Sequence, residues 1–227
     1  PSSGSLPLSI SGRLQAGHFR VPGHISSQYL SGLLLALPLL DGDSTIELTS
    51  PLESAPYVAM TCRTLGEFGI AVETTATGYA VRGRQAFIPA DYTVEKDFSQ
   101  AAFWLVANYL GSAIRLIGLP EQSAQGDRAI LSILADLKKH RPADEPFIID
   151  SAQIPDLVPV LAVAAGFTPG QTRIINGARL RLKESDRLTV TADVLKAIGA
   201  DIQVEGDSLV ISGRTTWPGG TADSHGD

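Results

Sequence analysis

The sequence predicts a mixed α/β (α+β) fold built from tandem repeats, and three observations support this prediction. Short segments with strand character alternate with apolar, helix-like segments along most of the 227 residues. Glycine or a glycine-containing turn ends the better-defined helices. A set of positions recurs 130 residues further along the chain: Leu65, Gly69, Val72, Tyr79 and Val81 align with Leu195, Gly199, Ile202, Leu209 and Ile211. Each complete unit therefore reads as strand, helix, strand, helix and two strands, a βαβαββ repeat.

The first complete unit lies in the early part of the chain. A strongly apolar helix is expected to stop at Asp41-Gly42-Asp43, and a second helix is expected to stop at Gly69. A hairpin follows, with Thr77-Gly78 as its turn. In order, we predict a short strand within residues 6–10, a helix over 29–40, a strand over 44–48, a helix over 57–68 and a hairpin over 72–81.

The last unit repeats this order, and a looser copy lies between the two. For the last unit we predict a helix over 157–165, a strand over 172–175, a helix over 188–198 and a hairpin across 205–207. For the middle copy we predict a helix over 101–110, a strand over 112–117 and a helix over 128–139. Because one unit cannot cover both faces of its helices, we expect the helices to pack inside and the sheets to lie outside.

The composition narrows the classes of function. The 18 Lys and Arg residues against 24 Asp and Glu residues give a net charge of −6, which argues against a nucleic-acid surface. The single cysteine excludes an intrachain disulfide, and the four scattered histidines predict no zinc cluster. The longest apolar run, residues 33–40, contains Pro38 and is too short to span a bilayer. Because the beginning of the sequence also lacks a signal-peptide pattern, we expect a cytoplasmic protein with no membrane and no nucleic-acid partner.

A charged turn at residues 177–188 precedes the last predicted helix. Asp186 can cap that helix by accepting hydrogen bonds from its free amide groups. If the turn is helical, Lys183, Glu184 and Arg187 project to one side of it. Two cations beside a helix start suit a phosphate or carboxylate ligand, and the carboxylate among them can move a proton. The alternative interpretation is a solvated helix start with an ordinary ion pair.

Two other polar segments precede apolar helices at equivalent points of the repeat. Ser26-Ser27-Gln28 could hold a phosphate oxygen with its hydroxyls and amide, or could simply cap a helix. Asp156, after Pro155, could accept a proton or bind a ligand, or could simply stabilise the helix dipole. The repeat places these segments at the same end of the assembly. We therefore expect them to converge with Ser54, Tyr57 and the charged turn on one cleft.

Taken together, the polar segments form four motifs: Pro22-Gly23-His24-Ile25-Ser26-Ser27-Gln28-Tyr29, Ser54-Ala55-Pro56-Tyr57, Ile154-Pro155-Asp156 and Arg181-Leu182-Lys183-Glu184-Ser185-Asp186-Arg187-Leu188. Over essentially the whole chain, they closely resemble the 5-enolpyruvylshikimate-3-phosphate synthase family, the 3-phosphoshikimate 1-carboxyvinyltransferases. The resemblance implies six βαβαββ repeats of the enolpyruvyl transferase type in two lobes, with the substrates between them. It places the last repeat of the N-terminal lobe in residues 1–92 and two repeats of an incomplete C-terminal lobe in residues 93–227, which implies a central piece of a longer enzyme.

The resemblance also implies a reaction, the transfer of the enolpyruvyl group of phosphoenolpyruvate to the 5-hydroxyl of shikimate 3-phosphate. Phosphate is released, and the step belongs to the biosynthesis of aromatic amino acids. By resemblance, Asp156 accepts the hydroxyl proton and Glu184 donates a proton. The substrate-binding residues implied are Ser26, Ser27, Gln28, Ser54, Tyr57, Asp156, Arg179, Lys183 and Arg187. Arg179 stands where some members have asparagine. The scheme requires no metal and no organic cofactor, and we expect the parent enzyme to be a monomer.

Departures from the family pattern limit the expected activity. An early Lys-Ser segment, a glycine-rich segment with a following arginine and a late lysine are missing, so we expect no turnover by this chain alone. Two alternatives remain: a UDP-N-acetylglucosamine enolpyruvyl transferase, and a non-catalytic repeat module that binds an anionic metabolite or a partner protein. The motif at residues 183–187 favours the shikimate acceptor over the first alternative. The coincidence of Asp156 and Glu184 with two cations argues against the second.

Overall fold

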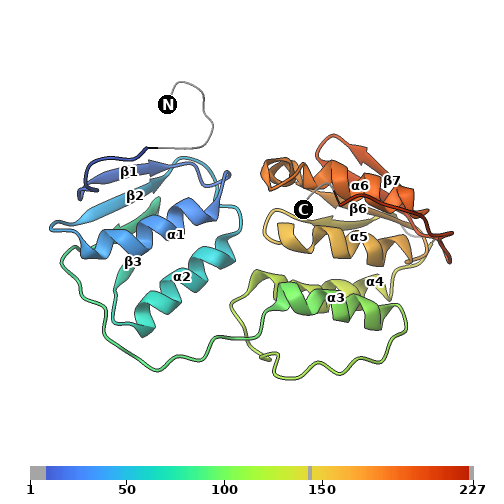
Figure 1. Ribbon diagram of the computed structural model, residues 1–227, viewed down its shortest axis with the longest axis horizontal. Helices are drawn as coiled ribbons and strands as arrows, with labels where there is room; N and C mark the ends of the chain where they lie inside the picture. Colours follow the sequence, from blue (N-terminus) through green and yellow to red (C-terminus); the bar gives the residue numbers. More distant parts are fainter. Residues whose placement is uncertain (1–8, 143–144, 225–227) are drawn as a thin grey trace.

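The computed structural model describes residues 9–142 and 145–224 and contains two four-stranded sheets with their helices. The N-terminal unit, residues 18–81, comprises β1 (His18–Val21), α1 (Ser27–Ala36), the 3-10 turn η1 (Leu37–Leu39), β2 (Ser44–Leu48), α2 (Ala55–Glu67), β3 (Val72–Thr75) and β4 (Gly78–Val81). The C-terminal unit, residues 98–212, comprises α3 (Phe98–Tyr109), η2 (Gly126–Ala129), α4 (Ile130–Leu137), β5 (Phe147–Asp150), η3 (Pro155–Leu157), α5 (Val158–Gly166), β6 (Gln171–Ile175), η4 (Ala178–Leu182), α6 (Arg187–Ala197), β7 (Asp201–Glu205) and β8 (Ser208–Ser212). Figure 1 shows the two units side by side.

The two sheets have the same topology. The strand order is β1-β2-β4-β3 in the first sheet and β5-β6-β8-β7 in the second. In each sheet the first pair is parallel and the others are antiparallel. Val72 pairs with Val81 in one hairpin, and Ile202 pairs with Ile211 at the equivalent place in the other. The α/β class and two copies of the predicted βαβαββ repeat are therefore confirmed.

Equivalent glycines follow the second helix of each unit. Gly69 follows α2 with a φ angle of +79°, and Gly199 follows α6 with a φ angle of +106°. Other residues adopt such backbone angles at a cost of about 1–3 kcal/mol. The recurrence of glycine across 130 positions, from 69 to 199, therefore reflects the same sharp turn from helix to strand.

The middle copy of the repeat is incomplete, and the strand predicted over residues 112–117 is wrong. That segment forms no strand, and α3 and α4 pack directly with α5. The side-chain amide of Asn108 occupies both backbone groups of Ile114, accepting from its N–H at 2.7 Å and donating to its carbonyl at 2.8 Å. A side chain thus takes the place of the neighbouring strand that this segment would need.

Other element boundaries differ from the predicted ones by a few residues. Helix α1 begins at Ser27 rather than Tyr29 because Ser26 caps it, and it gives way to η1 where Pro38 removes a backbone donor. The first hairpin turns through residues 76–77, one position earlier than predicted. The strand predicted within residues 6–10 lies mostly outside the described residues, and residues 9 and 10 form no strand.

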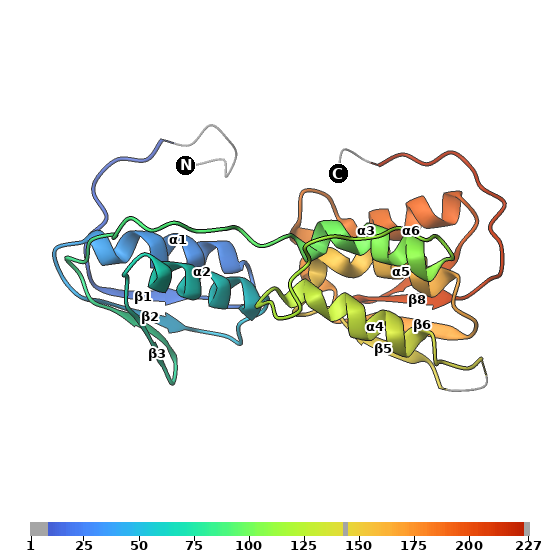
Figure 2. The same cartoon turned by 90° about the horizontal axis from the view of Figure 1, so that it is seen from below.

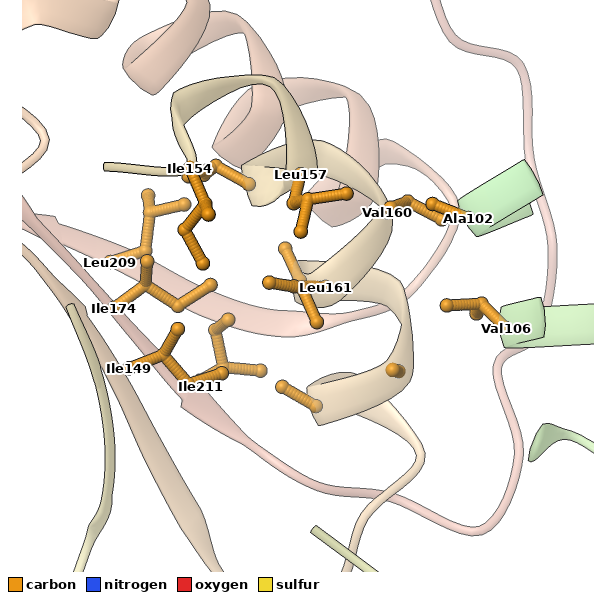
Figure 3. Close-up of a cluster of buried hydrophobic side chains, with 14 of the residues drawn as sticks. Ala102, Val106, Ile149, Ile154, Leu157, Val160, Leu161, Ile174, Leu209 and Ile211 are labelled. Carbon is orange, nitrogen blue, oxygen red and sulfur yellow. The ribbon is translucent and has the colours of Figure 1, made fainter. Parts of the chain in front are cut away.

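Helix α5 is the centre of the C-terminal unit. It lies between the sheet and α3, contacting β6 and β8 on one side and α3 on the other. In Figure 3, Leu161 of α5 lies over Ile174 and Ile211 of the sheet, while Val160 faces Ala102 of α3. A helix that is covered on both sides needs apolar residues all round, which explains the continuous apolar sequence over residues 157–165. The prediction of helices inside and sheet outside is confirmed here.

In the N-terminal unit, α1 and α2 contact each other and lie on the same face of the first sheet (Figure 2). Leu30 and Leu34 of α1 pack with Val58 and Leu65 of α2 over the buried Ile46 of β2. Burial of each such side chain stabilises the unit by about 1.5–3 kcal/mol. Both helix starts border the C-terminal unit.

Candidate functional site

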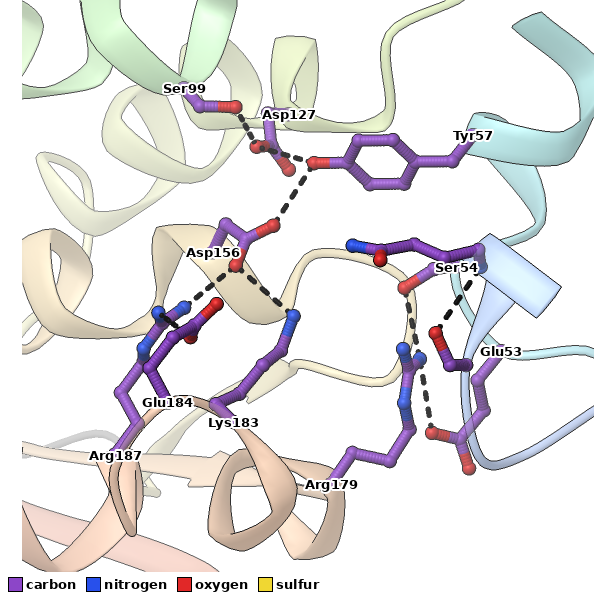
Figure 4. Close-up of polar contacts among 12 residues, drawn as sticks. Glu53, Ser54, Tyr57, Ser99, Asp127, Asp156, Arg179, Lys183, Glu184 and Arg187 are labelled. Atoms are coloured by element: carbon purple, nitrogen blue, oxygen red, sulfur yellow. Dashed lines mark hydrogen bonds and ion pairs between the residues drawn. The ribbon is translucent and has the colours of Figure 1, made fainter. Parts of the chain in front are cut away.

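A cavity of about 410 Å³ lies where the two units meet. Eight residues singled out in the sequence line it: Ser26, Ser27, Gln28, Ser54, Tyr57, Asp156, Arg179 and Lys183. The first five belong to the N-terminal unit and the other three to the C-terminal unit. The remaining two predicted site residues, Glu184 and Arg187, do not line this cavity but adjoin it through Asp156 (Figure 4). The structure therefore gathers groups that are far apart in the sequence into one place.

The start of α1 presents its polar groups to this cavity. Ser26 has extended backbone angles, and its Oγ accepts a hydrogen bond from the backbone N–H of Gln28 at 3.2 Å. Ser26 is therefore an N-cap, as the simpler interpretation of this segment proposed. Ser27 is buried and faces the cavity. The unpaired amide groups of a helix start carry partial positive charge, so this end of α1 favours an anion.

The start of α2 is strained at Ser54. This buried residue has the left-handed angles φ 53° and ψ 37°, which cost a non-glycine residue about 1–2 kcal/mol. Its side chain does not cap the helix. Instead, its Oγ accepts a hydrogen bond from Nη1 of Arg179 at 2.9 Å, and its backbone N–H donates to the carbonyl of Ala152 at 3.3 Å. Groups of the C-terminal unit thus hold Ser54 in this conformation.

Arg179 is the buried cation of the cavity. It lies in η4 with only 9% of its surface exposed, and its Nη1 is also 3.4 Å from a carboxylate oxygen of Glu53. Its Nε is buried with no hydrogen-bond partner among the described residues. A buried donor without an acceptor is costly, so the contacts of Nη1 with Ser54 and Glu53 matter for holding the guanidinium in the cavity wall.

Asp156 is the point at which the charged groups meet. Its Oδ1 accepts hydrogen bonds from Nη1 of Arg187 at 2.8 Å and from Nζ of Lys183 at 3.4 Å. Its Oδ2 accepts from the hydroxyl of Tyr57 at 3.2 Å, which reaches across from the N-terminal unit. Glu184 pairs with Nη2 of Arg187 at 2.8 Å and has a mostly exposed side chain. The two carboxylates predicted to move protons therefore flank one guanidinium.

The charged turn is shaped by the cap of α6. Asp186 accepts hydrogen bonds from the backbone N–H of Thr189 at 3.1 Å and from Nη1 of Arg181 at 2.7 Å. Burial alone would raise the pKa of Asp186, but the hydrogen bonds from Thr189 and Arg181 outweigh it, so that its pKa lies below the usual value. Both Arg179 and Arg181 belong to η4. Arg181 pairs with Asp186 outside the cavity, whereas Arg179 lines the cavity.

Two residues of this site were missed from the sequence, Asp127 of η2 and Ser99 of α3. The hydroxyl of Ser99 donates to Oδ2 of Asp127, and the hydroxyl of Tyr57 lies 3.4 Å from the same oxygen. Burial raises the pKa of Asp127, and burial together with the carboxylates of Asp127 and Asp156 raises the pKa of Tyr57. A signal was present, because Asp127 precedes the apolar helix α4 just as Asp156 precedes α5.

Gln153 is a third residue that sequence reasoning missed. Its Oε1 accepts from the backbone N–H of Ala55 at 2.8 Å, and its Nε2 donates to the carbonyl of Leu52 at 3.2 Å. One side-chain amide of the C-terminal unit therefore binds backbone groups on both sides of Ser54. Nothing in the pattern around residue 153 distinguishes it from a surface glutamine.

The site brings cations, hydroxyls and carboxylates together at helix starts. Such a set can bind an anion and move a proton next to it. Within residues 9–142 and 145–224, no group of three or more His, Cys, Asp or Glu side chains is placed to hold a metal ion. In the same part of the chain, no helix has the length and apolar character needed to cross a membrane.

The fold and the site together define a βαβαββ repeat protein of the enolpyruvyl transferase type. The enolpyruvyl transferase NikO from Streptomyces tendae shares this fold, with a TM-score of 0.56 and 17% identity over 88% of this chain and 52% of that one. The family model for EPSP synthase (3-phosphoshikimate 1-carboxyvinyltransferase) matches residues 2–227, and the chain belongs to that family.

Curated relatives and solved structures agree with this assignment. The chain is 46% identical to the 3-phosphoshikimate 1-carboxyvinyltransferase of Clostridium kluyveri, over 98% of this chain and 55% of the relative. It is 44% identical to the protein of the same name from Clostridium acetobutylicum, over 100% of this chain and 55% of the relative. An EPSP synthase structure from Acinetobacter baumannii superposes with a TM-score of 0.70 and 25% identity, covering 90% of this chain and 50% of that one. The chain thus spans about half the length of the curated relatives that it matches.

Proposed function

We propose that this chain carries the shikimate-3-phosphate site of a 3-phosphoshikimate 1-carboxyvinyltransferase. The enzyme transfers the enolpyruvyl group of phosphoenolpyruvate to the 5-hydroxyl of shikimate 3-phosphate and releases phosphate. The observation that carries the proposal is one shared cavity, in which Ser27 and Ser54 of the N-terminal unit face Asp156 and Lys183 of the C-terminal unit. A phosphate group needs hydroxyls and a cation, and the reacting hydroxyl needs a carboxylate.

The groups around the cavity suit the two ends of the acceptor. Ser26, Ser27, Gln28 and Ser54 surround the phosphate near the start of α1, where the helix dipole favours a negative charge. Arg179 and Lys183 supply the positive charge from the other unit, and Tyr57 lies beside the ring. Arg179 takes a place that asparagine holds in some family members, and its guanidinium brings a positive charge to the cavity wall.

Asp156 and Glu184 divide the proton transfers between them. In the addition step, the 5-hydroxyl oxygen bonds to C2 of phosphoenolpyruvate, Asp156 takes the hydroxyl proton and Glu184 gives a proton to the methylene carbon. In the elimination step, that carbon returns a proton to Glu184, the C–O bond to phosphate breaks, and Asp156 gives its proton to the departing phosphate, so that both acids regain their starting states. Arg187, paired with both carboxylates, is placed to bind phosphoenolpyruvate and to hold the two acids near each other. The scheme uses no metal and no organic cofactor.

The lobe boundary near residue 92 is part of the same proposal. The N-terminal unit ends with β4 at Val81 and the C-terminal unit begins with α3 at Phe98, and the segment between them contains no helix or strand until Phe98. An irregular segment of this kind permits one lobe to move against the other. We further propose that the parent enzyme is a cytoplasmic monomer.

Calorimetric titration of the chain with shikimate 3-phosphate tests the function. We expect saturable binding that is lost in Ser27→Ala and in Lys183→Ala, and unchanged in Lys139→Ala, whose exposed side chain pairs with Asp136 on α4. A parallel titration with UDP-N-acetylglucosamine should give no saturable heat. Absence of binding at millimolar shikimate 3-phosphate, or equal binding of both acceptors, would contradict the proposal. Phosphate release by the chain with both substrates present would contradict the expected lack of turnover.

A further inference from the structure

Asp127 is a buried carboxyl group at the back of the candidate site. It lies in η2 and has only 2% of its surface exposed. Its Oδ1 has no hydrogen-bond partner among the described residues. An unpaired oxygen of a buried carboxylate costs far more free energy than that of a neutral carboxylic acid. A carboxyl group buried in this way therefore points to a specific interaction with a neighbouring side chain.

The backbone around Asp127 is pressed closely against α2. A Cβ atom on the preceding Gly126 would lie 2.9 Å from a side-chain atom of Pro56 and 3.2 Å from the carbonyl oxygen of Gln153. Only glycine permits this approach. It brings Asp127 of the C-terminal unit next to Tyr57, which is one residue beyond Pro56 in the first turn of α2.

Tyr57 stands between two carboxyl groups. Its hydroxyl oxygen is 3.4 Å from Oδ2 of Asp127 and 3.2 Å from Oδ2 of Asp156 (Figure 4). A phenol has one proton and can donate to only one of them. If it donates to Asp156, the contact with Asp127 is favourable only when Asp127 donates in turn to the phenol oxygen. Ser99 has one hydroxyl proton, and while it donates that proton to Oδ2 of Asp127 it has none to give to the Tyr57 oxygen.

We propose that Asp127 is a positioning residue of this site, a neutral carboxylic acid that donates to the Tyr57 oxygen and so directs the Tyr57 proton to Asp156. The chain of donors runs from Asp127 through Tyr57 to Asp156, and Ser99 holds its first member in place. Burial and the negative charges of Asp156 and Asp97 raise the pKa of Asp127 and favour its neutral form, and they outweigh the contacts with Ser99 and Tyr57, which favour the carboxylate. This inference rests on the proposed function, because it assumes the role of Asp156 that is proposed there.

The Tyr57 hydroxyl gives a direct readout that needs no substrate. The chain has five tyrosines, so labelling their Cζ atoms with carbon-13 gives five resonances, and Tyr57→Phe assigns the one that matters. We expect Asp127→Ala to shift the Tyr57 resonance, and Asp127→Asn, whose amide can still donate, to leave it near its original position. Tyr109, whose hydroxyl bonds to Thr168 at 2.6 Å, serves as an internal reference. An unchanged Tyr57 resonance in Asp127→Ala, or equal shifts in both variants, would overturn the proposal.

A second measurement covers the case in which Asp127→Ala does not fold. In the unmodified chain with carbon-13 in the aspartate carboxyl groups, the Asp127 resonance should have the chemical shift of a protonated acid at neutral pH. Its assignment comes from Asp127→Asn. A carboxylate chemical shift at neutral pH would refute the donor role.

Substrate affinity separates this inference from the proposed function. We expect Asp127→Ala to weaken binding of shikimate 3-phosphate about tenfold, the value of one good hydrogen bond to a charged group. Asp136→Ala, on the exposed side of α4, should leave the affinity unchanged. If the unmodified chain does not bind shikimate 3-phosphate, the proposed function fails, while the Tyr57 and Asp127 resonances still decide the role of Asp127.

Discussion

The buried guanidinium of Arg179 donates a hydrogen bond to the hydroxyl of Ser54 across 2.9 Å, and this bond joins the C-terminal unit to the N-terminal unit. The backbone of Ser54 has left-handed angles that its own helix does not require. The contacts with Arg179 and Ala152 therefore hold a strained residue in the wall of the cavity. The contacts that join the two units therefore also form part of the cavity wall.

Replacing Arg179 should loosen this junction. Arg179→Ala leaves the buried hydroxyl of Ser54 and the carboxylate of Glu53 without their partner, so we expect a loss of about 1–3 kcal/mol in the free energy of unfolding. Urea denaturation measures it. The matched control is Arg173→Ala, which removes an ion pair with Glu205 on the outer surface of the second sheet and should cost about 0–1 kcal/mol. Equal losses in the two variants would show that Arg179 is an ordinary surface cation.

The glycines after the repeat helices should be irreplaceable. Gly199 has a φ angle of +106°, and a Cβ atom there would lie 2.2 Å from Cδ of Pro218. We expect Gly199→Ala to destabilise the chain by about 1–3 kcal/mol in thermal or urea unfolding. Gly32→Ala should have the opposite sign and stabilise by about 0.5–1 kcal/mol, because Gly32 lies inside α1 with open space around it. A Gly199→Ala variant as stable as the parent would contradict the turn geometry.

The cap of α6 should make stability depend on acid pH. The pKa of Asp186 is lowered in the folded chain, so its charge stabilises the fold above the unfolded pKa of about 3.9, and this contribution disappears as the pH falls through the lower folded value. Asp186→Asn keeps a capping oxygen but has no charge. The urea midpoint of the parent should therefore exceed that of Asp186→Asn at about pH 6, and the two should converge in acid below about pH 3. A difference that is constant with pH would rule out this role.

Much of the fold could be predicted because local signals and the repeat agree. The helices that end at Gly69 and Gly199 and the hairpins after them follow from turn chemistry that is visible in the sequence. The strand predicted over residues 112–117 failed for the opposite reason. The segment is mostly apolar, but a strand needs a neighbouring strand, and the side chain of Asn108 bonds to the backbone groups of Ile114 instead. The local sequence pattern cannot indicate whether a neighbouring strand is available for pairing.

The site was predictable as a set of residues but not as a network. The repeat put the segments of Ser27 and Asp156 at equivalent helix starts and Lys183 before the second helix of its unit, and the structure places all three residues around one cavity. The sequence did not reveal which of these side chains form hydrogen bonds within the protein itself. Ser26 caps α1, and Gln153 binds the backbone around Ser54, because pairing depends on distances between the units. The roles of these residues in binding remain predictions.

We propose that side chains of both units bind one anion at the same time. A nuclear magnetic resonance titration of the chain with shikimate 3-phosphate tests this most directly, with Ser27, Ser54 and Lys183 as reporters. We expect the resonances of all three residues to shift along a single saturation curve with one dissociation constant. Shifts confined to one unit, or separate curves for Ser27 and Lys183, would contradict it.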